Sequence, residues 1–217
     1  MVTRPGWLLP AVVLAVANGG CAVDDRDINV RPEPILIATF EDGTLQPNDA
    51  RFNRWASTVY NTEIGDRVYR VTSPGRDSGF ALELTWDITD PPNGTPDFPG
   101  ALIRTQALGS IDLTRYTTLS FSFRVDEGPY TPLQSIGIAI HCYERRTEVD
   151  IAQPVGSGWQ TIDLALADFV EPTWNFTGVE RADCLSRADE LDVVSGYNLN
   201  DGERAAATLL LDDIMFR

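Results

Sequence analysis

Short segments in which apolar residues occupy every second position recur along the chain from residue 35 onward. In the clearest, residues 119–125, Leu, Phe and Val alternate with Ser and Arg, and residues 80–88, 136–142 and 162–166 repeat the pattern. Successive side chains of a β-strand point to opposite faces, so each segment predicts a strand with one buried face. Clusters of Gly, Pro, Asn and Asp between the segments predict turns. The chain is therefore expected to be all-β, an antiparallel β-sandwich or barrel, in which only residues 180–191 look helical.

Composition and charge narrow the class of partner. The chain has 217 residues, 43% of them hydrophobic, which suffices for one domain with a sizeable core. Asp and Glu total 32 against 17 Lys and Arg, giving a formal net charge of −15. Such a surface repels phosphate backbones, so nucleic acid is not expected as a partner. An acidic surface does suit hard cations such as calcium.

The first 21 residues have the features of an export signal. Arg4 precedes an apolar run from Leu8 to Ala17 that is too short to span a bilayer. Residues 19–21, Gly-Gly-Cys, resemble the lipobox of bacterial lipoproteins, although Asn18 stands where an aliphatic residue is usual. We expect a lipoprotein-type signal peptide with Cys21 as the lipidated residue. The alternative is ordinary cleavage after the glycines, which would leave a free thiol.

The residues after the lipobox predict where the protein is placed. Ala22 directly follows the cysteine, which resembles the pattern that favours export to the outer membrane. The protein is expected to be exported and attached to a membrane by its lipid, as an outer-membrane lipoprotein or at the periplasmic or cell-surface side. Residues 22–34, AVDDRDINVRPEP, are polar and aperiodic and predict a flexible linker. The folded domain is then residues 35–217.

Cysteine usage agrees with export. Three Cys are present, so lipidation of Cys21 leaves Cys142 and Cys184 as a pair in an oxidising compartment. We expect a disulfide between them. The alternative is that Cys142 is a small buried apolar residue. Because there is no C-x-x-C motif or His/Cys cluster, the sequence disfavours zinc.

Four landmarks carry a resemblance to a known family of folds. They are ATFEDG at residues 38–43, IDLTRYTTLSFSFRV at 111–125, GWQTIDLALADF at 158–169 and LLLDDIMF at 209–216. In this order and spacing they resemble the β-jelly-roll domains of the galactose-binding superfamily, especially family 11 carbohydrate-binding modules and the complex I intermediate-associated family. The similarity covers nearly all of residues 35–217. It implies a jelly-roll sandwich but is less specific for function, because the superfamily binds many ligands.

The resemblance also implies a structural calcium ion. In related jelly rolls the first and last strands lie together, and an acidic residue of the FEDG-like turn and the first Asp of the terminal pair serve as ligands. Here these residues are Glu41 and Asp212, with Asp42 as a further candidate. Calcium takes roughly six to eight oxygen ligands, so backbone carbonyls would complete the shell. The alternative is that Asp213 faces water while Asp212 pairs with an Arg or caps a turn.

Aromatic and polar residues carried by strands are the candidates for ligand binding. A sugar binder needs flat aromatic faces for stacking and polar groups that fix orientation. His141 and Tyr143 are predicted on the polar face of their strand, beside a hollow left by Gly137 and Ala139. The resemblance adds Arg124, because family 11 modules use strand-borne Tyr, His and Arg residues across a concave cleft.

A second pair of aromatic candidates lies nearer the N-terminus. Trp55 and Tyr60 belong to RWASTVYN, a stretch too polar to be plain core. Trp86, by contrast, shares a strand face with Leu82 and Leu84 and is predicted to be core. Each ligand-binding candidate has a structural alternative, in which the side chain packs or pairs within the fold.

No catalytic machinery is evident. His141 is the sole histidine and has no nucleophile motif near it, and no dinucleotide-binding glycine motif, P-loop or H-E-x-x-H is present. We therefore expect a noncatalytic carbohydrate-binding module for a β-glucan-like polysaccharide, not an enzyme. The alternative is a protein-interaction, assembly or structural envelope lipoprotein without a sugar ligand. A hydrolase is a third class, because two suitably spaced carboxylates would suffice.

Overall fold

The computed structural model describes residues 32–217, apart from residues 63, 78, 93–98 and 153–157. The expected signal peptide (residues 1–21), its Cys21 and most of the 22–34 linker lie outside the described residues. Within the described part, no helix combines the length and the apolar character that crossing a membrane requires.

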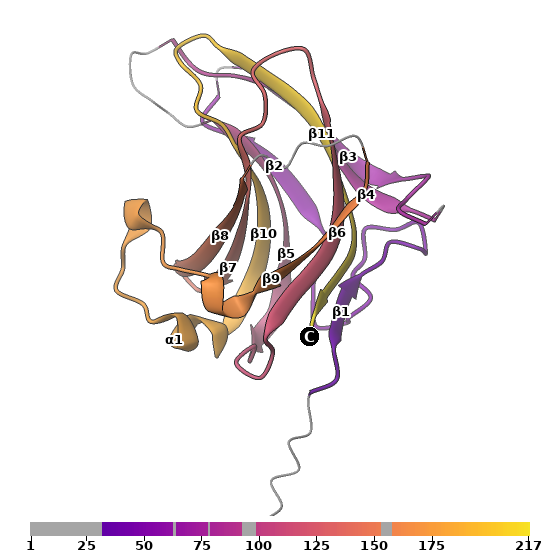
Figure 1. Cartoon of the computed structure of the whole chain (residues 1–217), viewed down its shortest axis with the longest axis vertical. Helices are drawn as coiled ribbons and strands as arrows, with labels where there is room; N and C mark the ends of the chain where they lie inside the picture. Colours follow the sequence, from indigo (N-terminus) through magenta and orange to yellow (C-terminus); the bar gives the residue numbers. More distant parts are fainter. Residues whose placement is uncertain (1–31, 63, 78, 93–98, 153–157) are drawn as a thin grey trace, which may run out of the picture. The chain divides into compact units, whose positions relative to one another are not determined.

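The described residues form two antiparallel β-sheets (Figure 1). The elements are β1 (Ile35–Ala38), β2 (Ala56–Tyr60), β3 (Ile64–Thr72), β4 (Ala81–Thr89), β5 (Gly100–Ile111), β6 (Thr118–Glu127), β7 (Ser135–Cys142), β8 (Arg145–Ala152), β9 (Gln160–Ala165), the 3-10 turns η1 (Leu166–Asp168) and η2 (Thr173–Asn175), α1 (Arg181–Leu185), β10 (Ala188–Gly196) and β11 (Arg204–Phe216). The six-stranded sheet has the order β3-β4-β11-β6-β9, with β1 also paired to β11. The five-stranded sheet has the order β2-β5-β10-β7-β8. The predicted antiparallel sandwich is confirmed.

The core lies between the two sheets and is built from the apolar members of the alternating segments. Trp86 of β4, Phe123 of β6 and Ile138 of β7 are each at most 1% exposed. Full burial of a large apolar side chain contributes roughly 1.5–3 kcal/mol. The neighbours of these residues along each strand point away from the core, which leaves two outer sheet faces free to carry polar side chains.

The first and last strands of the domain lie side by side, because β1 pairs antiparallel with β11. A bulge in β11 between Asp212 and Met215 shifts its register against β6, and Asp213 within it has a left-handed backbone (φ 52°). The bulge reverses the alternation, so that Leu211 faces the core before it and Ile214 faces the core after it. Asp212 therefore lies on the outer face of the six-stranded sheet. The sequence pattern did not determine which of the two faces Asp212 takes, because residues on both faces of this segment are apolar.

The stretch at residues 180–191 is helical only at its start. α1 ends at Leu185, and β10 begins at Ala188 and lies between β5 and β7. Pairing on both sides and core packing of its apolar residues override the local helical preference. The predicted disulfide is confirmed: Cys184 of α1 is bonded to Cys142 at the end of β7, and both are buried.

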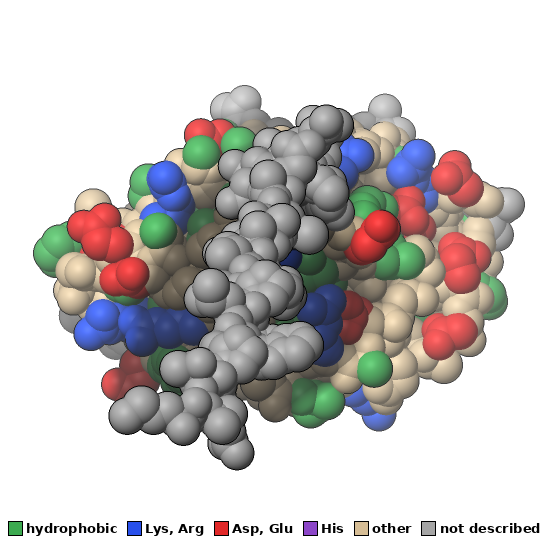
Figure 2. Space-filling model, turned by 90° about the horizontal axis from the view of Figure 1, so that it is seen from below, with side chains coloured by type: hydrophobic (Ala, Val, Ile, Leu, Met, Phe, Trp, Pro, Cys, Tyr) green, Lys and Arg blue, Asp and Glu red, His purple; other side chains and the backbone are tan. Residues whose placement is uncertain are grey.

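Charged side chains of both signs are spread over the surface. Figure 2 views the molecule from below Figure 1 and shows acidic side chains around the margin of this face, with basic ones among them. Several form exposed ion pairs, such as Arg217 with Asp163 and Arg51 with Asp49, each at 2.6 Å. Exposed pairs of this kind contribute only about 0–1 kcal/mol each. The fold is therefore held mainly by its core and its sheets.

Candidate ligand-binding face

The outer face of the five-stranded sheet gathers charged and aromatic side chains from all five strands. Residues on the inner face of the same strands, such as Ile103, Ile138 and Val193, belong to the core. Alternation along each strand therefore sends the intervening residues outward. We call this surface the polar face; it comprises Tyr60 of β2, Arg104 of β5, His141 of β7, Arg146 and Glu148 of β8, and Glu190 and Asp192 of β10.

Strand register places opposite charges next to one another across the polar face. His141 lies directly opposite Glu190 on β10 and opposite Arg146 on β8. Arg104 of β5 donates to Glu190 Oε1 at 3.3 Å, and Arg146 lies 2.8 Å from Glu148 Oε2. Arg146 and Glu148 are two residues apart on β8, so alternation places both on this face. Arg104 is diagonal to Glu190 on the neighbouring strand β10, within reach of a long side chain, so the sheet itself fixes this arrangement.

Three possible metal ligands meet at the centre of the polar face. One ligand atom each from His141, Glu190 and Asp192 lie within 4.8 Å of one another. His141 Nε2 is 3.1 Å from Asp192 Oδ2, and Asp192 is only 3% exposed. Burial raises the pKa of the Glu190 carboxyl, and the neighbouring Asp192 carboxylate raises it further. Two acidic groups are thus held close together in a largely desolvated place.

The two glycines on this face, Gly137 and Gly100, are covered by neighbouring side chains, so the hollow predicted beside His141 is partly filled. Gly137 lies in the middle of the face, as predicted, and a Cβ built on it would be 3.2 Å from Asp150 Oδ1, so the Asp150 side chain leans over that position. A Cβ on Gly100 would be 2.3 Å from the Tyr60 hydroxyl oxygen, so the Tyr60 ring lies across the bare backbone of its neighbouring strand. Burial raises the pKa of Tyr60. The ring is therefore fixed at the β2 edge of the face.

A tryptophan that the sequence reasoning did not select stands at the opposite edge, beside β8. Trp174 of η2 is 68% exposed, and its indole N–H donates to Glu148 Oε1 at 3.2 Å. The Arg146 guanidinium lies 4.0 Å from the centre of the ring, a cation–π contact. Val170, just before this turn, exchanges backbone hydrogen bonds with Glu148 at 2.8 and 2.9 Å. Burial raises the pKa of Glu148.

The loop that carries Trp174 is held together by one carboxylate. Glu171 accepts hydrogen bonds from the backbone N–H groups of Thr177, Gly178 and Val179 at 2.5, 3.0 and 3.3 Å, and from the Thr177 hydroxyl at 2.5 Å. Burial acts to raise the pKa of Glu171, but these hydrogen bonds together hold it below its ordinary value. The exposed aromatic ring is therefore presented on an ordered loop.

Comparison with solved structures identifies the fold. A family 11 carbohydrate-binding module of a cellulosomal cellulase from Clostridium thermocellum matches 85% of this chain and 94% of its own, with a TM-score of 0.53 and 14% identity. The fold is that of family 11 carbohydrate-binding modules. A family 11 module from the same organism, in complex with a β-1,3-1,4-mixed-linked tetrasaccharide, matches 84% of this chain and 94% of its own, with a TM-score of 0.52 and 15% identity. No protein-family model matches the sequence, and no curated protein is significantly similar to it.

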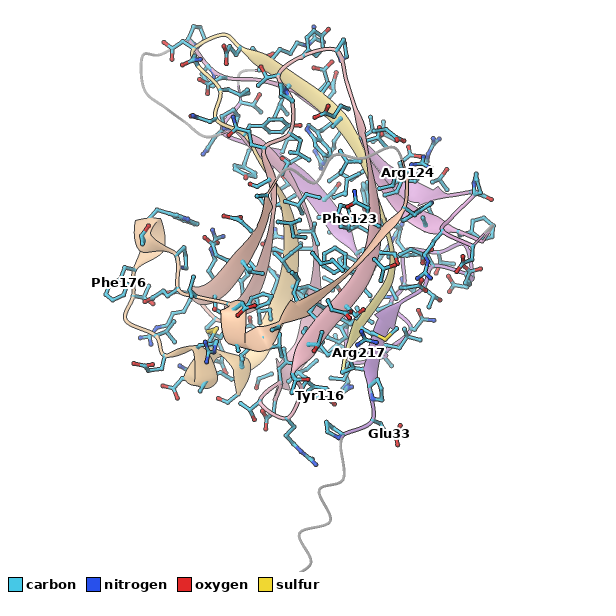
Figure 3. All side chains as sticks on the ribbon, in the orientation of Figure 1. Glu33, Tyr116, Phe123, Arg124, Phe176 and Arg217 are labelled. Atoms are coloured by element: carbon cyan, nitrogen blue, oxygen red, sulfur yellow. A yellow bond between two sulfur atoms is a disulfide. The ribbon has the colours of Figure 1, made fainter. Side chains whose placement is uncertain are left out.

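Within this carbohydrate-binding-module fold, two of the predicted ligand-binding residues lie away from the polar face. Trp55 is 1% exposed and packs its ring against Phe40, with ring centres 6.1 Å apart, so it is a core residue. Arg124 projects from the outer face of the other sheet, whereas Phe123 beside it points into the core (Figure 3). Arg124 pairs with Asp126 at 2.9 Å. The core separates it from His141, so the two cannot share a ligand.

Of the remaining candidates, His141 and Tyr60 share the polar face and Tyr143 does not extend it. β7 ends at Cys142, and Tyr143 lies in the following turn with a left-handed backbone (φ 64°) and 67% exposure. Its backbone N–H donates to Asp189 Oδ2 at 2.7 Å. The strict alternation used to place Tyr143 beside His141 stops at the strand end, which is why the sequence pattern misplaced it.

The predicted calcium ligands Glu41 and Asp212 both point at the connection between β3 and β4. Glu41 Oε1 accepts the N–H of Phe80 at 3.3 Å, and Asp212 Oδ2 accepts the N–H of Arg76 at 3.2 Å. A Cβ on Gly79 would lie 2.1 Å from the Glu41 carboxylate oxygens, so the carboxylate occupies the space that a side chain at Gly79 would take. One carboxylate from near each end of the domain thus accepts a backbone hydrogen bond from the β3–β4 connection.

This pair of carboxylates fits a divalent cation. Asp212 is 2% exposed, and burial, together with the nearby charges of Asp213 and Glu41, raises its pKa to about 6. The Arg76 guanidinium pairs with Asp213, at 3.0 Å. A bound cation would offset the cost of burying the Asp212 charge beside another carboxylate. Asp42 is engaged elsewhere: its carboxylate accepts the N–H and hydroxyl of Thr44, each at 2.9 Å.

Proposed function

We propose that this protein is a noncatalytic glycan-binding module that holds a β-glucan-like chain along the polar face. The observation that carries the proposal is Trp174, an exposed aromatic ring fixed at the edge of a sheet face lined by Arg and carboxylate side chains. Sugar binding needs this combination, since pyranose rings stack on flat aromatic surfaces while polar groups orient their hydroxyls. The shared fold with a module solved in complex with a β-1,3-1,4-mixed-linked tetrasaccharide supports a glycan as the ligand class.

The chemistry of the polar face suits an uncharged polymer. The Arg side chains are already matched by carboxylates, as in the Arg146–Glu148 and Arg104–Glu190 pairs. These paired Arg side chains still offer donors to sugar hydroxyls, and because their charge is already matched they attract no anionic ligand. Arg146 covers one side of the Trp174 ring, which leaves the other side for a sugar.

Calorimetric titration with soluble β-glucans, preceded by a glycan array, tests this function. We expect the wild-type protein to bind and Trp174→Ala to weaken binding about tenfold, because an aromatic contact contributes about 0.5–1.5 kcal/mol beyond buried area. Phe176→Ala is the matched control, since Phe176 is 76% exposed on the same loop and projects away from the sheets (Figure 3). Absence of binding to every glycan, or equal affinity for both variants, would reject the function.

The proposal includes export and a lipid anchor at Cys21, which rest on the lipobox-like residues 19–21 and the apolar run before them. Mass spectrometry of the membrane fraction should find a diacylated N-terminal cysteine, and Cys21→Ser should release the protein. It also includes a calcium ion held by Glu41 and Asp212, supported by their approach to one loop. That ion would clamp the first and last strands to the β3–β4 connection.

A further inference from the structure

We propose that His141, Glu190 and Asp192 form a binding site for a first-row transition-metal ion, with Zn²⁺ as the best match. This site is separate from the calcium pair at Glu41 and Asp212, and it does not depend on glycan binding. It uses one imidazole and two carboxylates from two neighbouring strands at the centre of the polar face.

The sheet geometry produces the cluster directly. Glu190 and Asp192 are two residues apart on β10 and so share a face, and His141 of β7 lies opposite Glu190. Three ligand atoms lie within 4.8 Å of one another, and the His141 Nε2 to Asp192 Oδ2 distance is 3.1 Å. Tetrahedral zinc with bonds of about 2.1 Å needs ligand atoms about 3.4 Å apart. Small side-chain rotations would therefore complete the site.

Two buried polar atoms without a hydrogen-bond partner are an independent reason to place an ion at this cluster. Asp192 is 3% exposed, and its Oδ1 has no hydrogen-bond partner among the described residues. His141 Nε2 is also buried, and although it lies 3.1 Å from Asp192 Oδ2 it has no hydrogen-bond partner among the described residues. Buried polar atoms left unpaired are costly. Atoms that approach closely without facing each other as donor and acceptor are arranged like ligands around a common centre.

The surrounding residues orient the ligands without supplying the missing cation. Arg104 and Gln106 donate to the two oxygens of Glu190, at 3.3 and 2.5 Å. Such partners are typical of metal-binding carboxylates, because they fix the orientation of the ligand. Arg146 is paired with Glu148, at 2.8 Å. Of the nearby Arg side chains, Arg104 therefore balances one carboxylate of the cluster and leaves the other in need of a positive charge.

The ligand set selects the class of metal. Calcium and magnesium prefer oxygen ligands, so an imidazole disfavours both. Imidazole with carboxylates suits zinc and its neighbours in the first transition row. Three protein ligands leave one coordination position for water. The absence of cysteine motifs in the sequence disfavours zinc, but this ligand set contains no cysteine and joins residues of two strands that are far apart in sequence.

Zinc titration of the full chain tests the site, with Cys21→Ser introduced so that no free thiol competes. Because His141 is the sole histidine, its ring signals in NMR report one residue without ambiguity. We expect one equivalent of Zn²⁺ to shift them at pH 7.5, and Ca²⁺ or Mg²⁺ at the same concentration to leave them unchanged. Calorimetry should give one Zn²⁺ per chain.

Variants separate this site from other acidic groups. Asp192→Asn and His141→Ala should each weaken Zn²⁺ binding at least a hundredfold, with circular dichroism used to verify folding. Asp150→Asn, on the same sheet face, and Asp212→Asn, at the calcium pair, should bind Zn²⁺ like the wild type. Unmoved His141 signals would overturn the proposal, and so would full Zn²⁺ affinity in folded His141→Ala, since binding would then lie elsewhere.

Discussion

Trp174 donates its indole N–H to Glu148 Oε1 at 3.2 Å, and this bond ties the loop after β9 to the polar face of the other sheet. The same Glu148 pairs with Arg146, whose guanidinium covers the Trp174 ring. One carboxylate therefore positions both the aromatic platform and the cation beneath it. A glycan that stacks on this ring, as proposed, would find it already held in place, which would lower the entropy lost on binding.

Replacing Glu148 should loosen this platform without unfolding the domain. In Glu148→Ala, Trp174 loses its hydrogen bond and Arg146 loses its ion-pair partner, so we expect glycan affinity to fall about three- to tenfold. The resonance of Trp174 in fluorine NMR of fluorotryptophan-labelled protein should narrow as the ring gains mobility. Glu144→Ala, in the turn before β8, is the control. Unchanged mobility of Trp174 would contradict the role given to Glu148.

The Glu171 carboxylate should set the order of the whole loop. Glu171→Ala removes four hydrogen-bond acceptor contacts within residues 171–179. Amide hydrogen exchange should accelerate at Thr177, Gly178 and Val179, while exchange in β6 and β11 stays slow because those strands lie in the core. Glycan affinity should fall with Glu171→Ala. Protection that persists at all three amides would show that other contacts order the loop.

Reduction of the disulfide should destabilise the domain. Cys142 and Cys184 are 42 residues apart in sequence. On the chain-entropy model, closing a loop of that length lowers the entropy of the unfolded chain by an amount that contributes about 4 kcal/mol. Urea unfolding of the wild type should shift to lower denaturant on addition of a reductant, whereas the double variant Cys142→Ser/Cys184→Ser should not respond. A reductant effect in that variant would point to another cause.

Without divalent ions, stability should fall as the pH rises through the range in which Asp212 ionises. The folded-state pKa is raised to about 6 from the ordinary 3.8. Between these values the folded state binds more protons than the unfolded state, so the free energy of unfolding decreases as pH increases. The loss should be about 1–3 kcal/mol and be complete above about pH 6. Thermal melts in chelator from pH 4 to pH 7 measure it, and Asp212→Asn should remove this dependence.

Calcium should restore the stability that is lost when Asp212 ionises. Added Ca²⁺ at pH 7 is expected to raise the melting temperature of the wild type, because the proposed site at Glu41 and Asp212 would bind it in the folded state. Asp212→Asn and Glu41→Gln should both respond less. Asp42→Asn should respond like the wild type, because the Asp42 carboxylate caps its own turn at Thr44. Equal calcium responses in all four proteins would place any calcium elsewhere.

Residue patterns were sufficient wherever the fold depends on local alternation. The segments around Leu82, Phe123 and Ile138 became β4, β6 and β7 with the predicted faces in the core. The pattern failed where a strand ends or bulges. Tyr143 lies past the end of β7, and the bulge at Asp213 reverses the alternation in β11. The direction of neither side chain can therefore be predicted from the two-residue period of a strand.

The sequence by itself determined that this chain forms strands with one apolar face, because the period of two is a property of each segment alone. It also predicted the pairing of Cys142 with Cys184, by assigning Cys21 to lipidation. Only the tertiary structure decided which strands became neighbours, and so which outward residues meet. His141 joins Glu190 and Asp192, and Glu148 joins Trp174, because strand order and register bring together residues that are far apart in sequence.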